Sequence, residues 1–310
     1  MQSNASTIVV LGTGGTIAGT AADASDNVGY TAGQLGVDSL VGAIPALAGV
    51  PQEAENVAQL DSKDMTHAVW RALALRCAHH LARAEVAGVV ITHGTDTLEE
   101  TAWFLQRVLA PAKPVVLAAA MRPATALHTD GPQNLLDAVR VAQTAGARGV
   151  VAVLAGEVHG ARDVRKVHPY RVDAFTSGDA GPMGCVEEGV LRRFRDWPAG
   201  EAIGTADLPE DAAAWPRVEI VTSHAGADGA IVRLLCAAGV QGVVVASTGN
   251  GTVHRELEAA LLQAQAQGVR VLRSTRCRNG RVLPAADKAL PAADDLTPEK
   301  ARVELMLRLL

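Results

Sequence analysis

The chain has 310 residues, enough for one large domain or two smaller domains with a buried core. Its hydrophobic fraction of 48% and charged fraction of 20% are close to the globular average, which argues against a disordered chain. The net charge of −5 leaves no basic surplus to neutralise phosphates, and an aromatic content of 3% leaves few rings for base stacking, so we expect no nucleic-acid partner.

No apolar run in the sequence is long enough to cross a bilayer. The longest candidate, residues 40–50, is interrupted by Gly42, Pro45 and Gly49, so we expect no membrane partner. The first ten residues lack the basic and apolar regions of a secretory signal. We therefore expect a cytoplasmic protein, unless a leader once preceded them.

The cysteines give no sign of a metal or redox site. They are widely spaced and form no C-x-x-C pair: Cys77, Cys185, Cys236 and Cys277. This spacing argues against zinc-ribbon and thioredoxin-like sites. In a reducing compartment we expect all four to behave as small buried hydrophobic residues.

Short apolar runs alternate with longer amphipathic segments in the first two thirds of the chain. The runs are rich in valine and do not alternate with polar residues, which predicts strands covered on both faces. We expect strands at residues 7–11, 87–92, 114–119 and 148–154, and helices at 64–84, 97–109 and 132–145. The second helix has a capping box, Thr97 with Glu100, and the third has Pro132 in its first turn. This order predicts an α/β fold with a doubly wound, mostly parallel sheet.

A change of composition predicts a second domain. Residues 195–217 contain three prolines and few β-branched residues, which is typical of a linker. After them we expect strands at 218–222, 242–246 and 269–273, and helices at 228–238, 253–267 and 298–309. The sequence thus predicts a larger N-terminal α/β domain (1–194), a linker, and a smaller C-terminal α/β domain (218–310).

A glycine-rich turn follows the first predicted strand, a position where α/β proteins commonly bind ligands. The dinucleotide fingerprint is absent because Ile17 stands where a third glycine is needed. The phosphate-binding loop pattern is also absent, because Gly19 is followed by Thr20 and not by lysine. What remains is the hydroxyl of Thr16 on a tight turn. From spacing alone, a turn that binds no ligand fits the sequence as well as a ligand-binding turn.

A second polar cluster, Thr-His-Gly-Thr-Asp-Thr-Leu-Glu-Glu at residues 92–100, lies between a predicted strand and a predicted helix. It places Thr95, Asp96 and free backbone N–H groups at a helix N-terminus, on the same sheet edge as Thr16. Such a terminus favours negative charge, including a developing oxyanion. Ordinary N-capping is the alternative, but capping explains one polar side chain and not the whole cluster.

The third candidate is Lys166, in the charged run from Gly160 to Lys166. A lysine in such a run is usually solvated, unless the segment folds back over the sheet edge. Elsewhere the polar residues are uninformative. His79 and His80 are adjacent on a helix, and no H-E-x-x-H spacing for a metal appears. No G-x-S-x-G elbow is present, which argues against an α/β-hydrolase. We therefore expect no metal site, and Ser223-His224 is more simply explained as a loop.

Taken together, these segments resemble the bacterial-type L-asparaginase family of asparaginase/glutaminase amidohydrolases, over nearly the whole chain. The matching blocks are Gly14–Gly19, Ile91–Thr97 with Glu99–Ala102, Ala120–Pro123, Asp130–Leu135 and Gly160–Lys166. The first two blocks as a pair are highly specific for this family, whereas the block that contains Lys166 is not specific by itself. The resemblance implies hydrolysis of L-asparagine to L-aspartate and ammonia, with minor glutaminase activity and no cofactor.

The resemblance also assigns roles. Thr16 is implied as the nucleophile, which forms a β-aspartyl ester that water then cleaves. Tyr30, on a mobile lid, is implied to close over the site and hydrogen-bond Thr16. Thr95, Asp96 and Lys166 are implied as a second triad, in which Lys166 is the base. A lysine titrates near 10.4, so this role requires desolvation or cationic neighbours, and Arg162 and Arg165 have the right sign.

Substrate contacts and assembly follow from the same resemblance. Asp96 is implied to bind the substrate ammonium and Ser62 its α-carboxylate, although Lys63 stands where relatives often carry glutamine. The family implies a homotetramer with sites at intimate-dimer interfaces. There the turn before Thr252 would open the helix at 253–267 and face a neighbouring subunit's site, although many relatives have asparagine at this position. The segment Arg278–Asp294 is short, and no acidic residue in it can be aligned with the one that relatives contribute across the interface.

Two other functions fit parts of these observations. An amino-acid sensor would keep the fold and the site without turnover, but a sensor would be free to lose Thr16. A glutamyl-tRNA amidotransferase subunit would need an extra N-terminal domain, and the first motif already begins at residue 12. The degree of preference for asparagine over glutamine is left open by the sequence.

Overall fold

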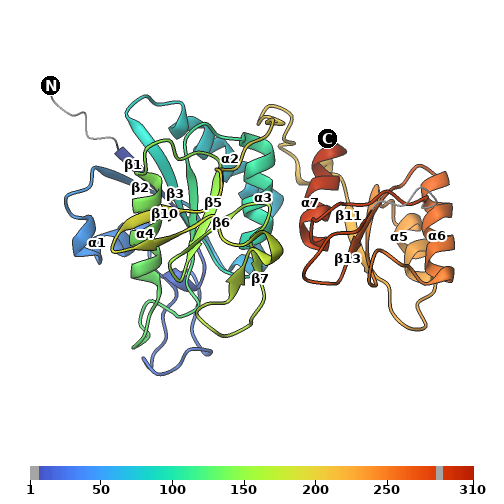
Figure 1. Ribbon diagram of the computed structural model, residues 1–310, viewed down its shortest axis with the longest axis horizontal. Helices are drawn as coiled ribbons and strands as arrows, with labels where there is room; N and C mark the ends of the chain where they lie inside the picture. Colours follow the sequence, from blue (N-terminus) through green and yellow to red (C-terminus); the bar gives the residue numbers. More distant parts are fainter. Residues whose placement is uncertain (1–6, 284–288) are drawn as a thin grey trace. The chain divides into compact units, whose positions relative to one another are not determined.

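The computed structural model describes residues 7–283 and 289–310. The chain forms two compact units, residues 1–208 and 209–310 (Figure 1). The first ten residues, for which the sequence predicts no secretory signal, lie partly outside the described ranges. Within those ranges, no helix is long and apolar enough to span a bilayer.

The first unit is built on an eight-stranded sheet with the order β10-β9-β6-β5-β4-β3-β1-β2. The strands are β1 (Thr7–Gly14), β2 (Gln52–Leu60), β3 (Val86–Thr92), β4 (Val115–Ala118), β5 (Val150–Leu154), β6 (Glu157–Gly160), β9 (Gly184–Glu187) and β10 (Val190–Arg193). Strands β1 to β5 pair in parallel, and β6, β9 and β10 continue the sheet in antiparallel fashion. A separate hairpin pairs β7 (Arg165–Lys166) with β8 (Phe175–Thr176). The predicted α/β class with a mostly parallel sheet is confirmed.

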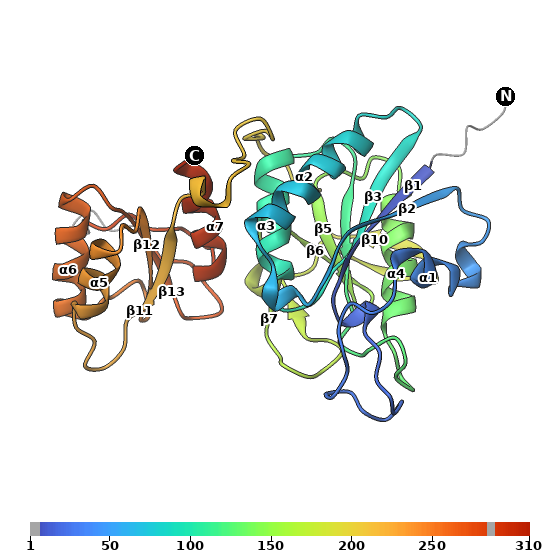
Figure 2. The same cartoon turned by 180° about the vertical axis from the view of Figure 1, so that it is seen from behind.

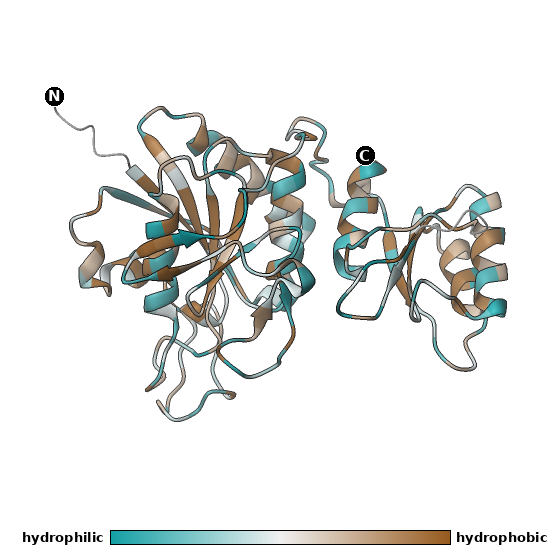
Figure 3. Cartoon of the chain, in the orientation of Figure 1, coloured by the Kyte–Doolittle hydropathy of each residue, from teal (hydrophilic) through white to brown (hydrophobic). Residues whose placement is uncertain are grey.

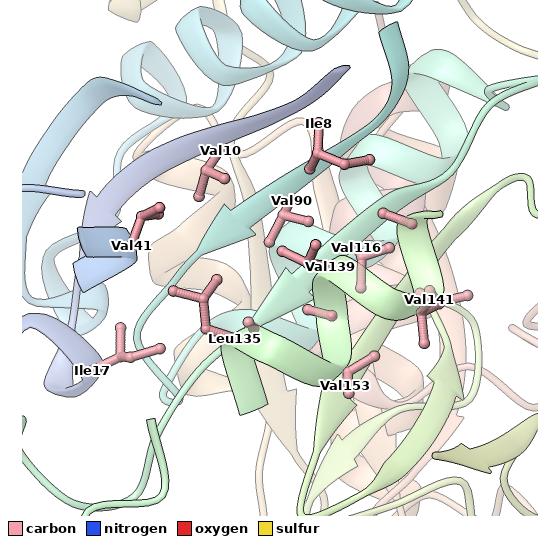
Figure 4. Close-up of a cluster of buried hydrophobic side chains, with 14 of the residues drawn as sticks. Ile8, Val10, Ile17, Val41, Val90, Val116, Leu135, Val139, Val141 and Val153 are labelled. Atoms are coloured by element: carbon pink, nitrogen blue, oxygen red, sulfur yellow. The ribbon is translucent and has the colours of Figure 1, made fainter. Parts of the chain in front are cut away.

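Helices cover both faces of this sheet (Figures 1 and 2). They are α1 (Val37–Gly42), α2 (His67–Leu81), α3 (Leu98–Leu109) and α4 (Gly131–Ala142). The buried cluster drawn in Figure 4 joins β1 and β3 to α1 and α4, for example Val10 and Val90 with Val41 and Leu135. Helices α2 and α3 lie on the other face of the sheet (Figure 2). Because valines and isoleucines project from both sides of the central strands, each face needs its own helical layer.

Of two sequence predictions for the starts of these helices, one is confirmed and the other is wrong. Pro132 lies in the first turn of α4, as expected. The capping box of α3 does not form, because Thr97 makes no side-chain cap. Its hydroxyl instead donates to the carbonyl oxygen of Ser62 at 2.8 Å. The Thr97 hydroxyl thus contacts the loop that carries Ser62 and does not cap its own helix.

The second unit contains a three-stranded parallel sheet with the order β11-β12-β13. Its strands are β11 (Val218–Thr222), β12 (Gly242–Ser247) and β13 (Arg270–Thr275), and its helices are α5 (Ala230–Ala237), α6 (Arg255–Ala266) and α7 (Pro298–Arg308). All six were predicted. Helix α7 begins as expected, with Pro298 in its first turn and the Thr297 side chain accepting the N–H of Lys300. In Figure 3 the strands of both units are mostly hydrophobic, as buried strands require.

The division between the units falls inside the stretch predicted as a linker, between Leu208 and Pro209. Residues before this point belong to the first unit: Trp197 and Leu208 are buried, and the N–H of Ile203 donates to the carbonyl oxygen of Arg107 on α3 at 2.9 Å. The domain limits given by the sequence remain predictions.

The cysteines differ from the expectation. All four are free thiols, but Cys77 alone is buried, whereas Cys185 and Cys236 are half-buried and Cys277 is exposed. Cys185 lies on the antiparallel edge hairpin and Cys236 near the end of a surface helix, where one side faces solvent. Cysteine content alone does not reveal such positions.

Candidate active site

The turn after β1 presents Thr16 at the carboxyl edge of the sheet. Gly14 and Gly15 have φ angles of 97° and 81°, a region that other residues rarely adopt. A Cβ on Gly14 would also collide with the backbone of Leu60. The chain then enters a short 3-10 helix, η1 (Thr16–Ala18), in which Thr16 is 8% exposed. The glycines are thus required for both the turn and the placement of the hydroxyl.

Tyr30 reaches Thr16 from the loop that follows. The two hydroxyl oxygens are 2.7 Å apart. This loop is closed at its base by a bridge between Thr20 and Thr31, whose backbone groups bond in both directions at 3.0 and 2.9 Å. At its tip, Asp26 accepts hydrogen bonds from two backbone N–H groups, which lower the pKa of its carboxyl group. The expected pairing of Tyr30 with Thr16 is therefore present in the structure.

The turn between β3 and α3 packs directly against the turn after β1. A Cβ on Gly15 would collide with the backbone of Gly94, and a Cβ on Gly94 would collide with the hydroxyl of Ser62. Parallel strands end at the same edge of a sheet, so these close approaches bring Thr16 and Thr95 into one site. Both hydroxyl-bearing side chains are nearly buried there, at 8% and 5% exposure.

Ser62 lies in the 3-10 turn η3 (Ser62–Asp64), which follows β2. Its hydroxyl oxygen accepts the N–H of Asp96 at 3.1 Å, and its carbonyl oxygen accepts the hydroxyl of Thr97. The neighbouring Lys63 is exposed and pairs with Asp64. Because the Ser62 oxygen accepts a hydrogen bond in this arrangement, its own proton can be donated to an anionic ligand.

Lys166 folds back over the sheet edge in the small β7–β8 hairpin. Its Nζ donates to Thr95 Oγ1 at 2.9 Å and to Asp96 Oδ1 at 2.7 Å. Its backbone N–H donates to the carboxylate of Glu99 at 3.2 Å, which ties the hairpin to α3. The lysine side chain is 21% exposed. Lys166 is therefore a partner of the other site residues and not a solvated surface lysine.

The expected cationic neighbours of Lys166 have other partners. The guanidinium of Arg162 lies over the ring of Trp103, 5.6 Å from its centroid. Arg165 Nε donates to the carbonyl oxygen of Asp163. The carboxylate of Asp96 lies 2.7 Å from Lys166 Nζ. Arg162 lies in the turn between β6 and β7, so its position close to Lys166 in the sequence does not by itself place its guanidinium beside the lysine amine.

The loop after β4 is held in place by Asp130 and Asn134. The backbone N–H groups of Met121 and Arg122 donate to the two carboxylate oxygens of Asp130, each at 3.0 Å. Asn134 Nδ2 donates to the carbonyl oxygen of Ala119 at 2.8 Å, and its Oδ1 accepts the N–H of Ala155 at 2.9 Å. These contacts explain structurally why the blocks at 120–123 and 130–135 occur in the sequence.

Thr252 belongs to the second unit, and its turn differs from the expectation. Its N–H donates to the carbonyl oxygen of Thr248 at 2.8 Å, and the two threonine hydroxyls are 2.8 Å apart. Helix α6 begins only at Arg255, after His254 as N-cap. The turn therefore does not open the helix, and its N–H at Thr252 is already used. Of the segment Arg278–Asp294, residues 284–288 lie outside the described ranges.

The structure also reveals residues that the motifs did not single out. Glu99 holds the backbone of Lys166, and His93 lies fully buried behind Thr95. Glu99 could have been found as an acidic residue in the first turn of a helix next to the site. Within the described ranges, no cluster of three or more histidine, cysteine or acidic side chains could hold a metal ion.

Comparison with known proteins gives consistent matches. The family model "Asparaginase, N-terminal" matches residues 7–198, and the model "Glutaminase/Asparaginase C-terminal domain" matches residues 217–310. The chain is 37% identical to L-asparaginase 2 of Escherichia coli (97% of this chain, 88% of the relative). It is 36% identical to a glutaminase-asparaginase of Pseudomonas fluorescens (97% and 86%). A crystal structure of a probable cytoplasmic L-asparaginase from Campylobacter jejuni is similar, with a TM-score of 0.91 and 37% identity over 98% of this chain and 95% of that one.

Proposed function

Because the chain belongs to the bacterial-type asparaginase family and is an L-asparaginase, we propose that Thr16 is the nucleophile with which it converts L-asparagine to L-aspartate and ammonia. The observation that carries this proposal is a pair of threonine hydroxyls on adjoining turns. Thr16 lies 2.7 Å from the phenol of Tyr30, and Thr95 lies 2.9 Å from the amine of Lys166. A hydroxyl becomes a useful nucleophile when a neighbouring group can take its proton, and this arrangement supplies such groups.

The reaction is proposed to proceed in two balanced steps. First, Thr16 Oγ bonds to the side-chain amide carbon, the carbon–nitrogen bond breaks, and a proton reaches the leaving nitrogen, which departs as ammonia. This step leaves a β-aspartyl ester on Thr16. Second, water attacks the ester carbon, Thr16 Oγ regains a proton, and L-aspartate leaves. This route requires no metal or cofactor.

The proton transfers are assigned to Lys166 and Thr95. In its neutral form, Lys166 Nζ accepts the proton of the Thr95 hydroxyl. Thr95 Oγ then accepts a proton from the attacking water or from Thr16. The distance of 2.9 Å between Nζ and Thr95 Oγ1 supports direct transfer between these two atoms.

The substrate is held by groups of complementary charge. The Asp96 carboxylate is half exposed beside Thr95 and is assigned to the α-ammonium of the substrate. The Ser62 hydroxyl is assigned to the α-carboxylate, since its oxygen already accepts the N–H of Asp96 and its proton is available. Thr252 is assigned to a neighbouring subunit's site in a homotetramer whose sites lie at intimate-dimer interfaces.

We also propose a cytoplasmic location. The similar structure from Campylobacter jejuni is that of a probable cytoplasmic L-asparaginase, and all four cysteines here are free thiols, as is usual in a reducing compartment. Fractionation of cells that express the native gene would test this. Recovery in the periplasmic fraction would contradict it.

An ammonia-release assay tests the function and its substrate range. L-Asparagine, D-asparagine and L-glutamine are compared at equal concentration. We expect the fastest release from L-asparagine and a slower release from L-glutamine. Equal rates for the two asparagine enantiomers would contradict the assigned contacts of Asp96 and Ser62, because these fix the configuration at the α-carbon.

A further inference from the structure

A buried chain of three side chains runs behind the turn between β3 and α3. Trp70 Nε1 on α2 donates to Thr101 Oγ1 on α3 at 2.8 Å, and Thr101 Oγ1 lies 3.0 Å from His93 Nε2. The other ring nitrogen, His93 Nδ1, lies 2.7 Å from the carbonyl oxygen of Gly94. Trp70 is 3% exposed, and the other two side chains are fully buried. None of the three is among the groups assigned to substrate or to proton transfer.

These contacts determine where the histidine proton lies. A carbonyl oxygen can only accept, so His93 Nδ1 must carry a hydrogen that it donates to Gly94. The indole N–H of Trp70 can only donate, so it occupies one lone pair of the Thr101 oxygen. The Thr101 hydroxyl proton is then available for His93 Nε2, which accepts it as the unprotonated nitrogen. The ring is therefore held neutral, in the Nδ1–H tautomer, with both nitrogens satisfied.

The Gly94 carbonyl oxygen controls the orientation of the peptide that precedes Thr95. In a planar trans peptide, the C=O and the N–H point in opposite directions. Since the carbonyl is turned inward to His93, the N–H of Thr95 is turned away from the buried ring. Among the described residues, no hydrogen-bond acceptor is found for this N–H. The same peptide also sets where the Thr95 side chain leaves the backbone, and hence its distance from Lys166.

We infer that His93 is a positioning residue: by donating from Nδ1 to the Gly94 carbonyl, it fixes the Gly94–Thr95 peptide so that the Thr95 N–H and hydroxyl face the reacting groups. This inference rests on the proposed catalytic role of Thr95. A preorganised backbone donor stabilises negative charge that develops during attack on a carbonyl carbon. His93 thus acts on turnover through Thr95 and does not touch the substrate.

Two substitutions at His93 separate this role from simple filling of the core. His93→Asn keeps a nitrogen donor at the position of Nδ1 and can still reach the Gly94 carbonyl. His93→Gln places its amide near the position of Nε2, where it can reach Thr101 but not Gly94. Both substitutions remove the buried ring, so both should lower the melting temperature by similar amounts.

The inference predicts different kinetics for the two variants. His93→Asn should stay within about tenfold of the wild-type kcat, whereas His93→Gln should lose on the order of a hundredfold, as expected for a misplaced reacting group. KM and the binding of L-aspartate, measured by calorimetry, should change less than about twofold in either variant, because the Asp96 and Ser62 side chains are untouched. A purely structural histidine would instead give equal losses of kcat in both.

Two further measurements decide the outcome even if a variant folds poorly. ¹⁵N NMR of the wild-type imidazole should show the neutral Nδ1–H tautomer at pH 7, and a proton on Nε2 would overturn the inference. Thr95→Val tests the underlying assignment separately. If Thr95→Val keeps turnover, the proposed role of Thr95 fails. If Thr95→Val is inactive while His93→Asn and His93→Gln have equal kcat, only the inference about His93 fails.

Discussion

The turn after β1 and the turn after β3 end at the same edge of the sheet, yet their hydroxyl groups have different surroundings. Thr16 has its hydroxyl partner, Tyr30, on a surface loop whose tip residue Val28 is 78% exposed. Thr95 is backed by fully buried His93 and contacts Lys166, whose hairpin is tied to α3. The proposed mechanism thus places the assigned nucleophile beside a surface loop and the assigned proton-transfer group on a buried support.

This difference has a physical reason. A substrate must enter, so one side of the site has to be built from a segment with few buried contacts, which costs little to open. The other side must keep donor and acceptor atoms within tenths of an ångström, and dense buried contacts achieve that. Substitutions on the two sides should therefore have different effects. On the Thr16 side they should lower turnover, either by removing a reacting group or by disturbing closure of the loop. On the Thr95 side they should displace the reacting groups or lower the stability of the fold.

The largest effect is expected for Thr16→Val. The side chain is nearly isosteric but has no hydroxyl, so no ester can form and turnover should fall by several orders of magnitude. The melting temperature should change little, because the turn depends on Gly14 and Gly15. The measurement is kcat for ammonia release, alongside thermal unfolding. A variant that retains more than a tenth of the wild-type kcat would show that Thr16 is not the nucleophile.

The second-largest loss of turnover is expected for Lys166→Met. Loss of the amine removes the proton acceptor of Thr95, so turnover should nearly vanish. Binding of L-aspartate should remain detectable by calorimetry, since its contacts are assigned to Asp96 and Ser62. If aspartate binding and activity are lost in the same proportion, Lys166 is a substrate clamp and its assignment as base is wrong.

The elements and the site were predictable to different extents. Strands β1, β3, β4 and β5 were found because their apolar runs are buried on both faces. Strand β2 was missed because it is an edge strand without a fully buried residue, and its sequence, QEAENVAQL, has no apolar run. The antiparallel strands β6, β9 and β10 were missed because their sequences, EVHG, GCVE and VLRR, contain no continuous apolar run like the VVLA of the equally short β4.

For the site, the two threonine motifs indicated which turns meet, because each follows a buried strand. The roles of Thr16, Tyr30, Ser62 and Lys166 came from family resemblance and remain proposals. His93 was not singled out, since a satisfied core histidine is the usual outcome. Its partner Thr101 on α3 is eight residues away in the sequence, and Trp70 on α2, which bonds Thr101, is 31 residues from Thr101. Only the packing of these helices brings them together, so no local pattern could have indicated the contact.

The buried side of the site should make stability depend on pH. Burial lowers the pKa of His93 from 6.5 to about 4. Below pH 6.5 the unfolded chain takes up a proton that the folded protein binds only near pH 4. The stability contribution of a neutral His93 is therefore complete above pH 6.5 and is lost as the pH falls towards 4, by a total of about 3 kcal/mol.

Denaturant unfolding at pH 7 and at pH 4.5 would measure this loss, with His93→Asn as the matched control. An asparagine does not titrate, so the pH dependence in this range should be weaker in the variant by most of that amount. Equal pH dependence in both proteins would show that His93 is not the group responsible.

Tyr30→Phe should have a smaller effect on the exposed side. It removes the hydroxyl that contacts Thr16 but keeps the ring, and the Thr20–Thr31 bridge at the base of the loop is unchanged. We expect kcat to fall by roughly ten- to a hundredfold, within the range of a single proton-transfer group. Stability should be unaffected, because Tyr30 is only half-buried. Wild-type kcat in this variant would limit the role of the loop to covering the site.

The smallest effect is expected for Thr252→Ala in the second unit. If its hydroxyl contributes to a neighbouring subunit's site, its removal weakens ground-state and transition-state binding alike, so KM should rise more than kcat falls. The hydroxyl already pairs with Thr248, which leaves only part of its hydrogen-bonding capacity for a substrate, so we expect a rise in KM of no more than about tenfold. Thr252→Ser, which keeps the hydroxyl, should behave as wild type. The kinetics are paired with light scattering: a fully active monomer at assay concentration would contradict the shared site, and an unchanged KM in Thr252→Ala would leave Thr252 as a residue that closes its own turn.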